Sequence, residues 1–272
     1  MSTRDSAAGR PAAKKTVRVS AVKELADGIC ELVLTYPERE RPENAVPGQF
    51  VMIYPGDGSH ILGRPISVCG YNPVEGALRL VFRVVGKGTG ELAALKPGEE
   101  ADVLGLLGNG YPMEELRTRK SEGATIALVG GGIGIPPMLE LARQLPGCRA
   151  VLGYRTDDLF LMDEFQEYAV TQAATEDGSF GTKGTVLDVL RQGAAPDILC
   201  ACGPLPMLRA LKEYAAENGV TAFLSLEERM ACGVGVCLGC VCRTTYKDAH
   251  SQVNRARVCT EGPVFRAEDV EL

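Results

Sequence analysis

The sequence predicts a multidomain α+β protein, in which an antiparallel β-barrel precedes a parallel-sheet α/β domain and a small cysteine-rich domain. Three observations support this: regularly spaced short strands in the first part, strands alternating with helices in the middle, and a cysteine cluster near the end. A chain of 272 residues suggests two or three domains. The predicted boundaries are a disordered tail (1–15), the barrel (16–119), the α/β domain (120–225) and the cysteine-rich domain (226–272).

The barrel is predicted from short stretches rich in Val and Ile, with Gly and Pro between them. Regular short strands with turn signals are typical of a small β-barrel or sandwich. The residues before them are small, polar and basic, which is typical of a disordered tail. The expected strands cover residues 17–22, 29–36, 49–55, 66–71, 77–86 and 99–108.

The α/β domain is predicted from a change of pattern near residue 121. An apolar strand that ends in glycines is followed by helical periodicity, and strands and helices then alternate. This alternation is typical of a parallel sheet covered by helices. The expected strands are 123–132, 149–155, 197–204 and 221–227, and the expected helices are 136–145, 183–192 and 206–219.

The composition limits the classes of partner and compartment. A net charge of −6 argues against a nucleic-acid partner and gives no support to an anionic membrane surface. The sequence has no apolar run of about eighteen residues, so no membrane span is expected, and no apolar stretch typical of a signal peptide. Ten cysteines without such a signal favour the reducing cytoplasm. With only His60 and His250, a His-based metal site is poorly supported.

The cysteine-rich segment contains C-x4-C-x2-C, followed by eighteen residues and a further cysteine. This is the plant-type [2Fe–2S] spacing with a shorter gap to the last cysteine. The glycines between the first three cysteines allow positive φ and let backbone N–H groups approach the sulfurs. The predicted ligands are Cys232, Cys237, Cys240 and Cys259.

Two other interpretations of the cysteines were weighed. Structural zinc usually shows paired C-x2-C knuckles, and this segment has only one such pair. Cysteines are also common core residues, and this is the interpretation favoured for four of them. Cys242 is left out of the ligand set, because an extended backbone would turn its side chain away from the metal side. The expected core cysteines are Cys30, Cys69, Cys148 and Cys200.

Two motifs of the α/β domain suggest a nucleotide. The sequence GGGIGIPP (130–137) follows a strand and opens a helix, where N–H groups and the helix dipole favour phosphate. It reads G-x-G-x-x-P, not the dinucleotide fingerprint, and prolines are tolerated in the first helical turn. Cys202, Gly203 and Pro204 end another strand, at the sheet edge where ligands bind. Tight turns without a ligand are the alternative for both motifs.

Two motifs of the barrel can contact phosphate. The arginine of RPIS (64–67) can pair with a phosphate, and its serine hydroxyl can reach a ring nitrogen. In VFRVVGKGTG, Gly88 and Thr89 can offer a backbone N–H and a hydroxyl to phosphate oxygens. Each motif is weak alone, and their order along the chain makes them specific.

The order RPIS, VFRVVGKGTG, GGGIGIPP and CGP resembles the ferredoxin–NADP reductase superfamily, a flavin barrel followed by a nicotinamide domain. The segments EERMACGVGVCLGCVC and RVCTEGPVF resemble the electron-transfer subunits of the two-subunit, NAD-dependent dihydroorotate dehydrogenases. Related small subunits of ferredoxin-dependent NADP reductases often have Asp at the first ligand position, so Cys232 favours the dihydroorotate family. The resemblance covers nearly the whole chain after the tail.

The resemblance implies roles for the matched residues. Many superfamily members carry an aromatic residue where Ile66 stands, so ring stacking at that face is in doubt. The implied FAD contacts are Arg64, Pro65, Ile66, Ser67, Val81, Phe82, Arg83, Gly88 and Thr89. The implied contacts of the nicotinamide nucleotide are Gly130, Gly131, Gly132, Gly134, Cys202, Gly203 and Pro204.

The implied function is that of an electron-transfer subunit of an oxidoreductase. A cluster moves single electrons, a nicotinamide takes a hydride, and a flavin can do both. We expect electrons to enter at the [2Fe–2S] cluster, to reduce the FAD, and to leave as hydride to NAD+, with Ser67 and Cys202 beside the transfer. The three domains use the whole chain, so a partner must oxidise dihydroorotate. The resemblance implies an FMN-containing catalytic subunit, a heterotetramer with two copies of each chain, and a place in pyrimidine (UMP) biosynthesis.

Several alternatives stay open from the sequence. Electrons could run the opposite way, from NAD(P)H to a ferredoxin or an oxygenase, or the cysteines could bind zinc in a non-catalytic docking module. The apolar side chains of the cysteine loop, at Val234, Val236 and Leu238, could face a partner or pack inward. Arg155 could meet a 2′-phosphate, while the nearby aspartates at 157 and 158 would oppose one, so the residues do not decide between NAD and NADP.

Overall fold

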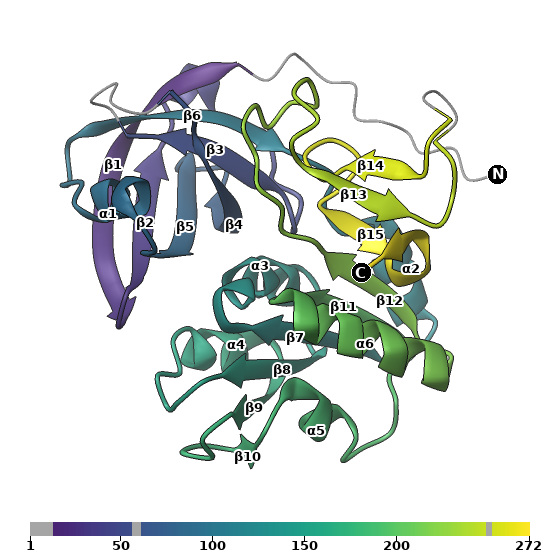
Figure 1. The fold of residues 1–272 in the computed structure, drawn as a ribbon. Helices are drawn as coiled ribbons and strands as arrows, with labels where there is room; N and C mark the ends of the chain where they lie inside the picture. Colours follow the sequence, from purple (N-terminus) through teal and green to yellow (C-terminus); the bar gives the residue numbers. More distant parts are fainter. Residues whose placement is uncertain (1–12, 56–60, 249–251) are drawn as a thin grey trace.

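The computed structural model describes residues 13–55, 61–248 and 252–272. Figure 1 shows the barrel above the α/β domain, with the C-terminal segment beside both. Most of the predicted tail, His60 and His250 lie outside the described residues. The predicted architecture, a barrel followed by a parallel sheet, is confirmed.

The first domain is a closed antiparallel barrel with the strand order β1-β2-β5-β4-β3-β6. All six predicted strands are present. The first begins earlier than expected, because Lys14 pairs with Leu104 inside the range predicted as a tail. The strands are β1 (Lys14–Ala26), β2 (Ile29–Thr35), β3 (Phe50–Tyr54), β4 (Arg64–Asn72), β5 (Ala77–Arg83) and β6 (Glu100–Leu107).

The side chains of β5 alternate between the barrel core and its outer face, as the two-residue period of a strand requires. Leu78, Leu80 and Phe82 belong to the barrel core. Val81 packs instead with residues of the α/β domain, and Arg79 is half-buried on the same outer face. The outer face of β5 is therefore the side that meets the second domain.

In the described part of the chain, one 3-10 turn and two short helices lie between or after the barrel strands. The 3-10 turn η1 lies before β3, α1 follows β5, and α2 leads from the barrel into the second domain. Sequence periodicity predicted none of them, because α1 contains two glycines and α2 buries only Leu116. Their bounds are η1 (Glu38–Glu40), α1 (Lys87–Ala93) and α2 (Met113–Ser121).

The second domain is built on a sheet with the order β10-β9-β8-β7-β11-β12-β15. Every pair is parallel except β12 with β15, which is antiparallel. The strands are β7 (Ile126–Gly131), β8 (Arg149–Tyr154), β9 (Val170–Thr175), β10 (Thr182–Lys183), β11 (Ile198–Cys202), β12 (Thr221–Ser225) and β15 (Val264–Arg266). The helices are η2 (Gly132–Gly134), α3 (Pro136–Gln144), α4 (Met162–Tyr168), α5 (Val186–Leu190) and α6 (Leu205–Asn218).

The cysteine-rich segment is tied into the rest of the molecule. It forms a small sheet of β14 (Arg255–Arg257), β13 (Val241–Thr244) and β16 (Val270–Glu271), and η3 (Ala267–Asp269) precedes the last strand. Its strand β15 completes the sheet of the second domain. Phe50 and Met52 of the barrel share one hydrophobic cluster with Cys240 and Cys259. The three predicted parts therefore pack as one body around shared cores.

Tyr111 joins the barrel to the second domain. It is buried, and its hydroxyl donates to the carbonyl oxygen of Ala201 in β11 at 3.0 Å. Its backbone N–H donates to the carbonyl oxygen of Pro47, just before β3, at 2.8 Å. Burial, with the thiol of Cys202 nearby, raises the pKa of Tyr111 well above its usual value. The hydroxyl therefore stays protonated and acts as a donor.

We expect Tyr111→Phe to lower the free energy of unfolding by about 1 kcal/mol, because it removes one buried hydrogen bond and keeps the ring. The measurement is the urea midpoint followed by far-UV circular dichroism. Tyr168→Phe, at a half-buried position on α4, is the control and should leave the midpoint unchanged. Equal midpoints for Tyr111→Phe and the unaltered protein would contradict the role given to this hydroxyl.

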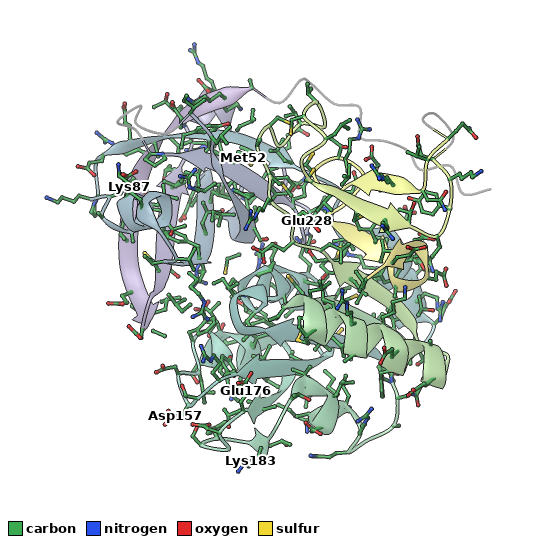
Figure 2. All side chains as sticks on the ribbon, viewed as in Figure 1. Met52, Lys87, Asp157, Glu176, Lys183 and Glu228 are labelled. Carbon is green, nitrogen blue, oxygen red and sulfur yellow. The ribbon has the colours of Figure 1, made fainter. Side chains whose placement is uncertain are left out.

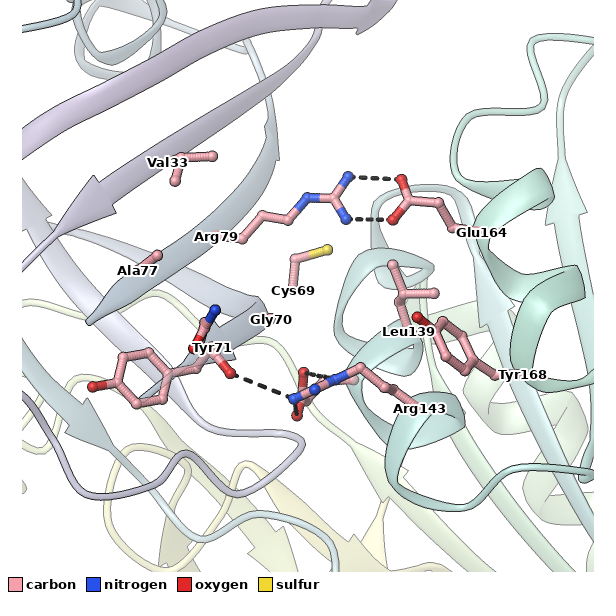
Figure 3. A pocket seen from close by; sticks show the side chains of 12 residues that line it. Val33, Cys69, Gly70, Tyr71, Ala77, Arg79, Leu139, Arg143, Glu164 and Tyr168 are labelled. Atoms are coloured by element: carbon pink, nitrogen blue, oxygen red, sulfur yellow. Dashed lines mark hydrogen bonds and ion pairs between the residues drawn. The ribbon is translucent and has the colours of Figure 1, made fainter. Parts of the chain in front are cut away.

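Charged side chains also cross the seam between the two domains (Figure 3). Arg79 of β5 donates from Nη1 to Oε2 of Glu164 in α4 at 2.5 Å, and from Nη2 to Oε1 at 2.8 Å. Its Nε also donates to Glu31 within the barrel at 2.6 Å. Arg143 of α3 donates to the carbonyl oxygen of Tyr71 in β4 at 3.4 Å. Arg79, Glu164 and Arg143 line a cavity of about 290 Å³ between the domains.

Candidate functional site

The loop from Cys232 to Cys240 directs backbone N–H groups at sulfur atoms. The N–H of Gly235 donates to Sγ of Cys259 at 3.2 Å, and the N–H of Cys237 donates to Sγ of Cys232 at 3.4 Å. The N–H groups of Val234 and Gly239 donate to Cys232 at 3.5 Å and to Cys237 at 3.4 Å. Donors of this kind stabilise negative charge on sulfur, as a metal-bound thiolate requires.

The turn of this loop depends on left-handed backbone conformations. Gly233 and Gly235 have φ of +70° and +80°, and Leu238 has φ of +57°. Glycine adopts this region freely, whereas a leucine there costs roughly 1–2 kcal/mol. Such strain persists only where the surrounding structure holds it, and it is found most often at functional sites.

The four predicted ligands lie in two neighbouring pairs, Cys232 with Cys237 and Cys240 with Cys259. Burial acts to raise the pKa of Cys232, but the N–H groups of Cys237 and Val234 outweigh it and lower the pKa to about 6. Burial beside Cys240 raises the pKa of Cys259. Among the described residues, no three His, Cys, Asp or Glu side chains are arranged around one metal ion. Two pairs of thiols suit a two-iron cluster, in which each iron takes two protein ligands.

Cys242 and the four expected core cysteines differ in burial. Cys242 is half-buried in β13, where its register partner is Ala256. Burial raises its pKa to about 11, so it stays a thiol at neutral pH. The four cysteines expected in the core are buried: Cys30, Cys69, Cys148 and Cys200.

The two nucleotide motifs of the second domain meet at the carboxyl edge of its sheet. Gly130 and Cys202 are register partners on β7 and β11. A Cβ at Gly134 would lie 2.3 Å from the carbonyl oxygen of Cys202 and 2.5 Å from the nitrogen of Gly203. A Cβ at Gly131 would lie 2.4 Å from Sδ of Met207. Gly134 is therefore required for direct backbone packing between the two turns, whereas Gly131 meets only the end of a flexible side chain.

The start of α3 offers fewer phosphate donors than the sequence suggested. Pro136 and Pro137 occupy its first turn and have no N–H. The N–H groups of Ile135 and Met138 donate to carbonyl oxygens inside the turn, at 3.1 and 3.0 Å. A phosphate at this edge must therefore rely on the glycine turn η2.

Cys202 stands at the end of β11, next to Ser225 at the end of β12. Burial raises the pKa of its thiol to about 12, although a hydrogen bond from Ser225 acts to lower it. The side chain packs against the same hydrophobic cluster as Val81 of the barrel. Cys202 therefore presents a neutral thiol at the carboxyl edge of the sheet.

The predicted flavin motifs of the barrel also come together. A Cβ at Gly88 would lie 2.3 Å from Nε of Arg64, so the guanidinium of β4 rests against the first turn of α1. The hydroxyl of Thr89 accepts from the N–H of Val85 at 3.0 Å and donates to the carbonyl oxygen of Gly86 at 3.1 Å. Because this hydroxyl caps α1, the donors that remain for a phosphate are the backbone N–H groups of that turn and Arg64.

The other barrel residues predicted to contact the flavin point either into the barrel core or toward its outer face. The side chains of Ile66 and Phe82 belong to the barrel core. Only their backbone can therefore face a flavin on the outside of the barrel. Ser67 and Arg83 are half-buried, and Val81 faces the second domain.

The cysteine loop and the glycine turn both adjoin the strands that carry these flavin motifs. A Cβ at Gly233 would lie 2.6 Å from Cγ of Met52 in β3, where the barrel meets the C-terminal segment (Figure 2). Met52 is the register partner of Pro65 in β4. On the other side, β5 contacts the turn η2. The barrel therefore contacts both the cysteine loop and the glycine turn of the nucleotide edge.

Sequence motifs missed several residues that hold this arrangement. Asn109 donates from Nδ2 to the carbonyl oxygen of Thr260 at 2.9 Å, and from its N–H to that of Gly262 at 2.6 Å. It thereby fastens the turn after Cys259 to the end of the barrel. Arg257 and Glu261 form an ion pair on the same turn. For Arg257 and Glu261, the only signal in the sequence was a charge two positions from the predicted ligand Cys259.

Paired thiols on a loop beside a barrel, joined to a parallel sheet with a glycine turn, define an iron–sulfur flavoprotein reductase. Residues 227–271 match the family model described as the iron-sulfur cluster binding domain of dihydroorotate dehydrogenase B. The chain belongs to the family of electron transfer subunits of dihydroorotate dehydrogenase B (NAD(+)). The subunit of Fusobacterium nucleatum is 44% identical over 241 residues, 85% of this chain and 88% of the relative. That of Lysinibacillus sphaericus is 41% identical over 266 residues, 95% and 99% of the two chains.

The chain is also similar in fold to solved reductases. A chain of the NADH-dependent reduced ferredoxin-NADP oxidoreductase has a TM-score of 0.78 and 30% identity, over 97% of this chain and 91% of that chain. A ferredoxin NADP+ reductase from Neisseria gonorrhoeae has a TM-score of 0.62 and 16% identity, over 77% and 93%. The second similarity shows the fold alone.

Proposed function

We propose that this chain passes electrons from a dihydroorotate-oxidising catalytic subunit to NAD+ in pyrimidine biosynthesis. The observation that carries the proposal is the cysteine loop, with its N–H groups directed at paired thiols beside the barrel. The family and the matched domain support FAD, a [2Fe–2S] cluster and NAD as cofactors, the set expected from the sequence. When bound, the flavin connects the one-electron chemistry of the cluster to the two-electron chemistry of the nicotinamide.

Each part of the chain has a proposed binding role. Cys232, Cys237, Cys240 and Cys259 would hold the cluster through deprotonated sulfurs. Arg64 would pair with an FAD phosphate beside the N–H groups of the first turn of α1. The other proposed FAD contacts are Pro65, Ser67, Val81, Arg83, Gly88 and Thr89, with backbone contacts from Ile66 and Phe82.

The nucleotide edge would orient the nicotinamide. Gly130 to Gly134 and the turn Cys202-Gly203-Pro204 would meet the nicotinamide nucleotide, and the open space beside Gly132 would let a phosphate approach the backbone closely. The neutral thiol of Cys202 and the hydroxyl of Ser67 would flank the ring and exclude water from the transferred hydride. The domain ranges proposed for these roles are 16–119, 120–225 and 226–272.

The cofactor assignment is tested by the visible spectrum and by iron, sulfide and flavin analysis of anaerobically purified protein. We expect flavin bands, a broad iron–sulfur shoulder, and about two irons with one FAD per chain. A colourless, zinc-containing protein would instead support the docking-module alternative.

A catalytic partner is implied by the name that the relatives carry, electron transfer subunit. We propose that this partner carries FMN and that two copies of each chain assemble in the cytoplasm. Within the described ranges, no helix has the length and apolar character needed to cross a bilayer. The side chains of Val234, Val236 and Leu238 do not pack inward, since they are 39, 79 and 60% exposed. They surround the exposed ligand Cys237, so this apolar face is the proposed docking surface.

We expect Val236→Asp and Leu238→Asp to weaken binding of the catalytic subunit by at least about tenfold, because a charge in the apolar centre of an interface is desolvated without a partner. The measurement is a dissociation constant from mixing purified subunits of the same source. Val74→Asp, at an 80% exposed position on the turn between β4 and β5, is the control and should bind normally. Normal binding by all three variants would show that this face is not the docking surface. If the unaltered chain does not bind the catalytic subunit, the proposed partner is wrong.

One structural similarity favours a second candidate function. The solved chain at 30% identity comes from an NADH-dependent reduced ferredoxin-NADP oxidoreductase. This chain could therefore exchange electrons with a ferredoxin, using NAD(P)H as the donor. Two rates decide between the functions: reduction of the purified chain by its catalytic subunit plus dihydroorotate, and reduction of an oxidised ferredoxin by the purified chain plus NAD(P)H.

A further inference from the structure

Arg257 connects the cysteine loop to the segment that carries the fourth cysteine. It ends β14, two residues before Cys259. Its Nη1 donates to the carbonyl oxygen of Gly235 at 3.2 Å. Its Nε donates to Oε2 and Oε1 of Glu261 at 2.9 and 3.0 Å, and its backbone N–H donates to Oε2 at 2.6 Å. The guanidinium therefore spans the loop on one side and the turn after Cys259 on the other.

Gly235 receives this contact on the same residue whose N–H donates to Sγ of Cys259 at 3.2 Å. Gly235 has a φ of +80°, which favours glycine. The space beside it is also small, since a Cβ there would lie 2.9 Å from Cγ2 of Thr260 and 3.2 Å from Nη1 of Arg257. Arg257 thus holds the carbonyl group of Gly235, and the N–H group of the same residue donates to the sulfur of Cys259. The hydrogen bond to the sulfur and the bond to the guanidinium depend on one backbone orientation.

The pair also places charge beside the sulfur of Cys259. The hydrogen bond that Arg257 donates to Glu261 is the largest contribution that raises the pKa of Arg257. Burial acts to raise the pKa of Glu261, but its bonds from Arg257 outweigh this and lower it. Arg257 and Glu261 form an ion pair, so the guanidinium brings a positive charge and the carboxylate a negative charge to this turn. Their side chains are 41 and 30% exposed, so water screens part of their field.

We propose that Arg257 is a positioning residue that directs the Gly235 N–H at the Cys259 sulfur and sets the reduction potential of the cluster. The inference rests on the proposed function, in which the four cysteines hold a [2Fe–2S] cluster. Reduction adds one electron to the cluster, so a positive charge nearby favours the reduced form and raises the potential. Net charge, hydrogen bonds to sulfur and exposure are the factors by which proteins tune such clusters. Glu261 opposes the charge of Arg257 and holds its geometry.

The test is a redox titration of the cluster in the full chain, followed by electron paramagnetic resonance. Arg257→Gln should shift the midpoint to a more negative potential and change the line shape, because it removes the charge and the bond to Gly235. Glu261→Gln should shift the midpoint in the positive direction, because the arginine charge is no longer neutralised. Arg257→Lys keeps the charge without the planar fork, and its shift should be smaller than that of Arg257→Gln.

Arg255→Gln is the matched control, since it removes an exposed cation from the same strand, two residues earlier. Its midpoint should equal that of the unaltered protein. The inference is overturned if Glu261→Gln leaves the midpoint unchanged, or if Arg257→Gln and Arg255→Gln shift it equally. If the Arg257→Gln protein contains no iron, the Glu261→Gln variant still tests the inference, because it retains Arg257. Absence of iron from the unaltered protein would refute the proposed function instead.

Discussion

Cys240→Ser is expected to remove the iron–sulfur absorbance while FAD stays bound. Cys240 is buried beside Cys259, so a serine leaves one iron without a thiolate in a site that excludes water. Loss of an outer hydrogen-bonding partner already costs about 10–100-fold in metal affinity or activity, and loss of a ligand costs at least as much. We therefore expect electron flow from dihydroorotate to NAD+ to fall at least about 100-fold.

Cys242→Ser is the control for this experiment, since it changes a thiol two residues away that lies in β13. Its iron, sulfide and flavin contents should equal those of the unaltered protein. The contents are measured on anaerobically purified variants, together with their visible spectra. Full iron in Cys240→Ser, or loss of iron in Cys242→Ser alone, would show that the ligand set is wrong.

Gly134→Ala is expected to raise the KM for the nicotinamide nucleotide roughly 10–100-fold. The added methyl group would lie 2.3 Å from the carbonyl oxygen of Cys202, so the two turns at the nucleotide edge must separate. Strain of this kind typically costs about 1–3 kcal/mol, and each 1.4 kcal/mol is about tenfold in an equilibrium constant. The assay is NADH oxidation with ferricyanide, which needs no partner subunit.

Gly132→Ala is the matched variant on the same turn. Its Cβ would meet nothing within 4 Å, although its φ of +52° is unfavourable for alanine. We expect it to lower stability by about 1–2 kcal/mol with little change in KM. If both variants change KM equally, backbone strain in the turn matters, and packing against Cys202 does not.

The sequence was sufficient for the elements whose signals are local. The barrel strands alternate Val, Ile and Leu with polar residues, and the long helix α6 has a clear apolar face and ends at Gly219. Spacing alone was sufficient to propose the cysteine ligands, because the loop geometry follows from residues only a few positions apart. The helix α2 was missed because it is polar on nearly all sides.

Contacts between distant segments could not be predicted. Nothing in VFR (264–266) shows that it pairs with β12, about forty residues earlier in the chain. The ion pair of Arg79 with Glu164 joins residues 85 positions apart, and the alternation of β5 shows only that Arg79 points outward. We expected Thr89 to offer its hydroxyl to a phosphate because the short helix α1 was not predicted. In the structure this hydroxyl caps the start of α1.

The antiparallel strand β15 has a consequence for synthesis on the ribosome. It follows the last ligand in the chain, so β12 is an open edge of the sheet until residues 264–266 have been made. Open strand edges are templates for pairing with other chains, and nascent proteins expose them for seconds. The turn after Cys259 leads directly into β15, so closing this edge also brings the fourth cysteine to the loop. Protection of the nascent sheet and completion of the proposed metal site therefore coincide.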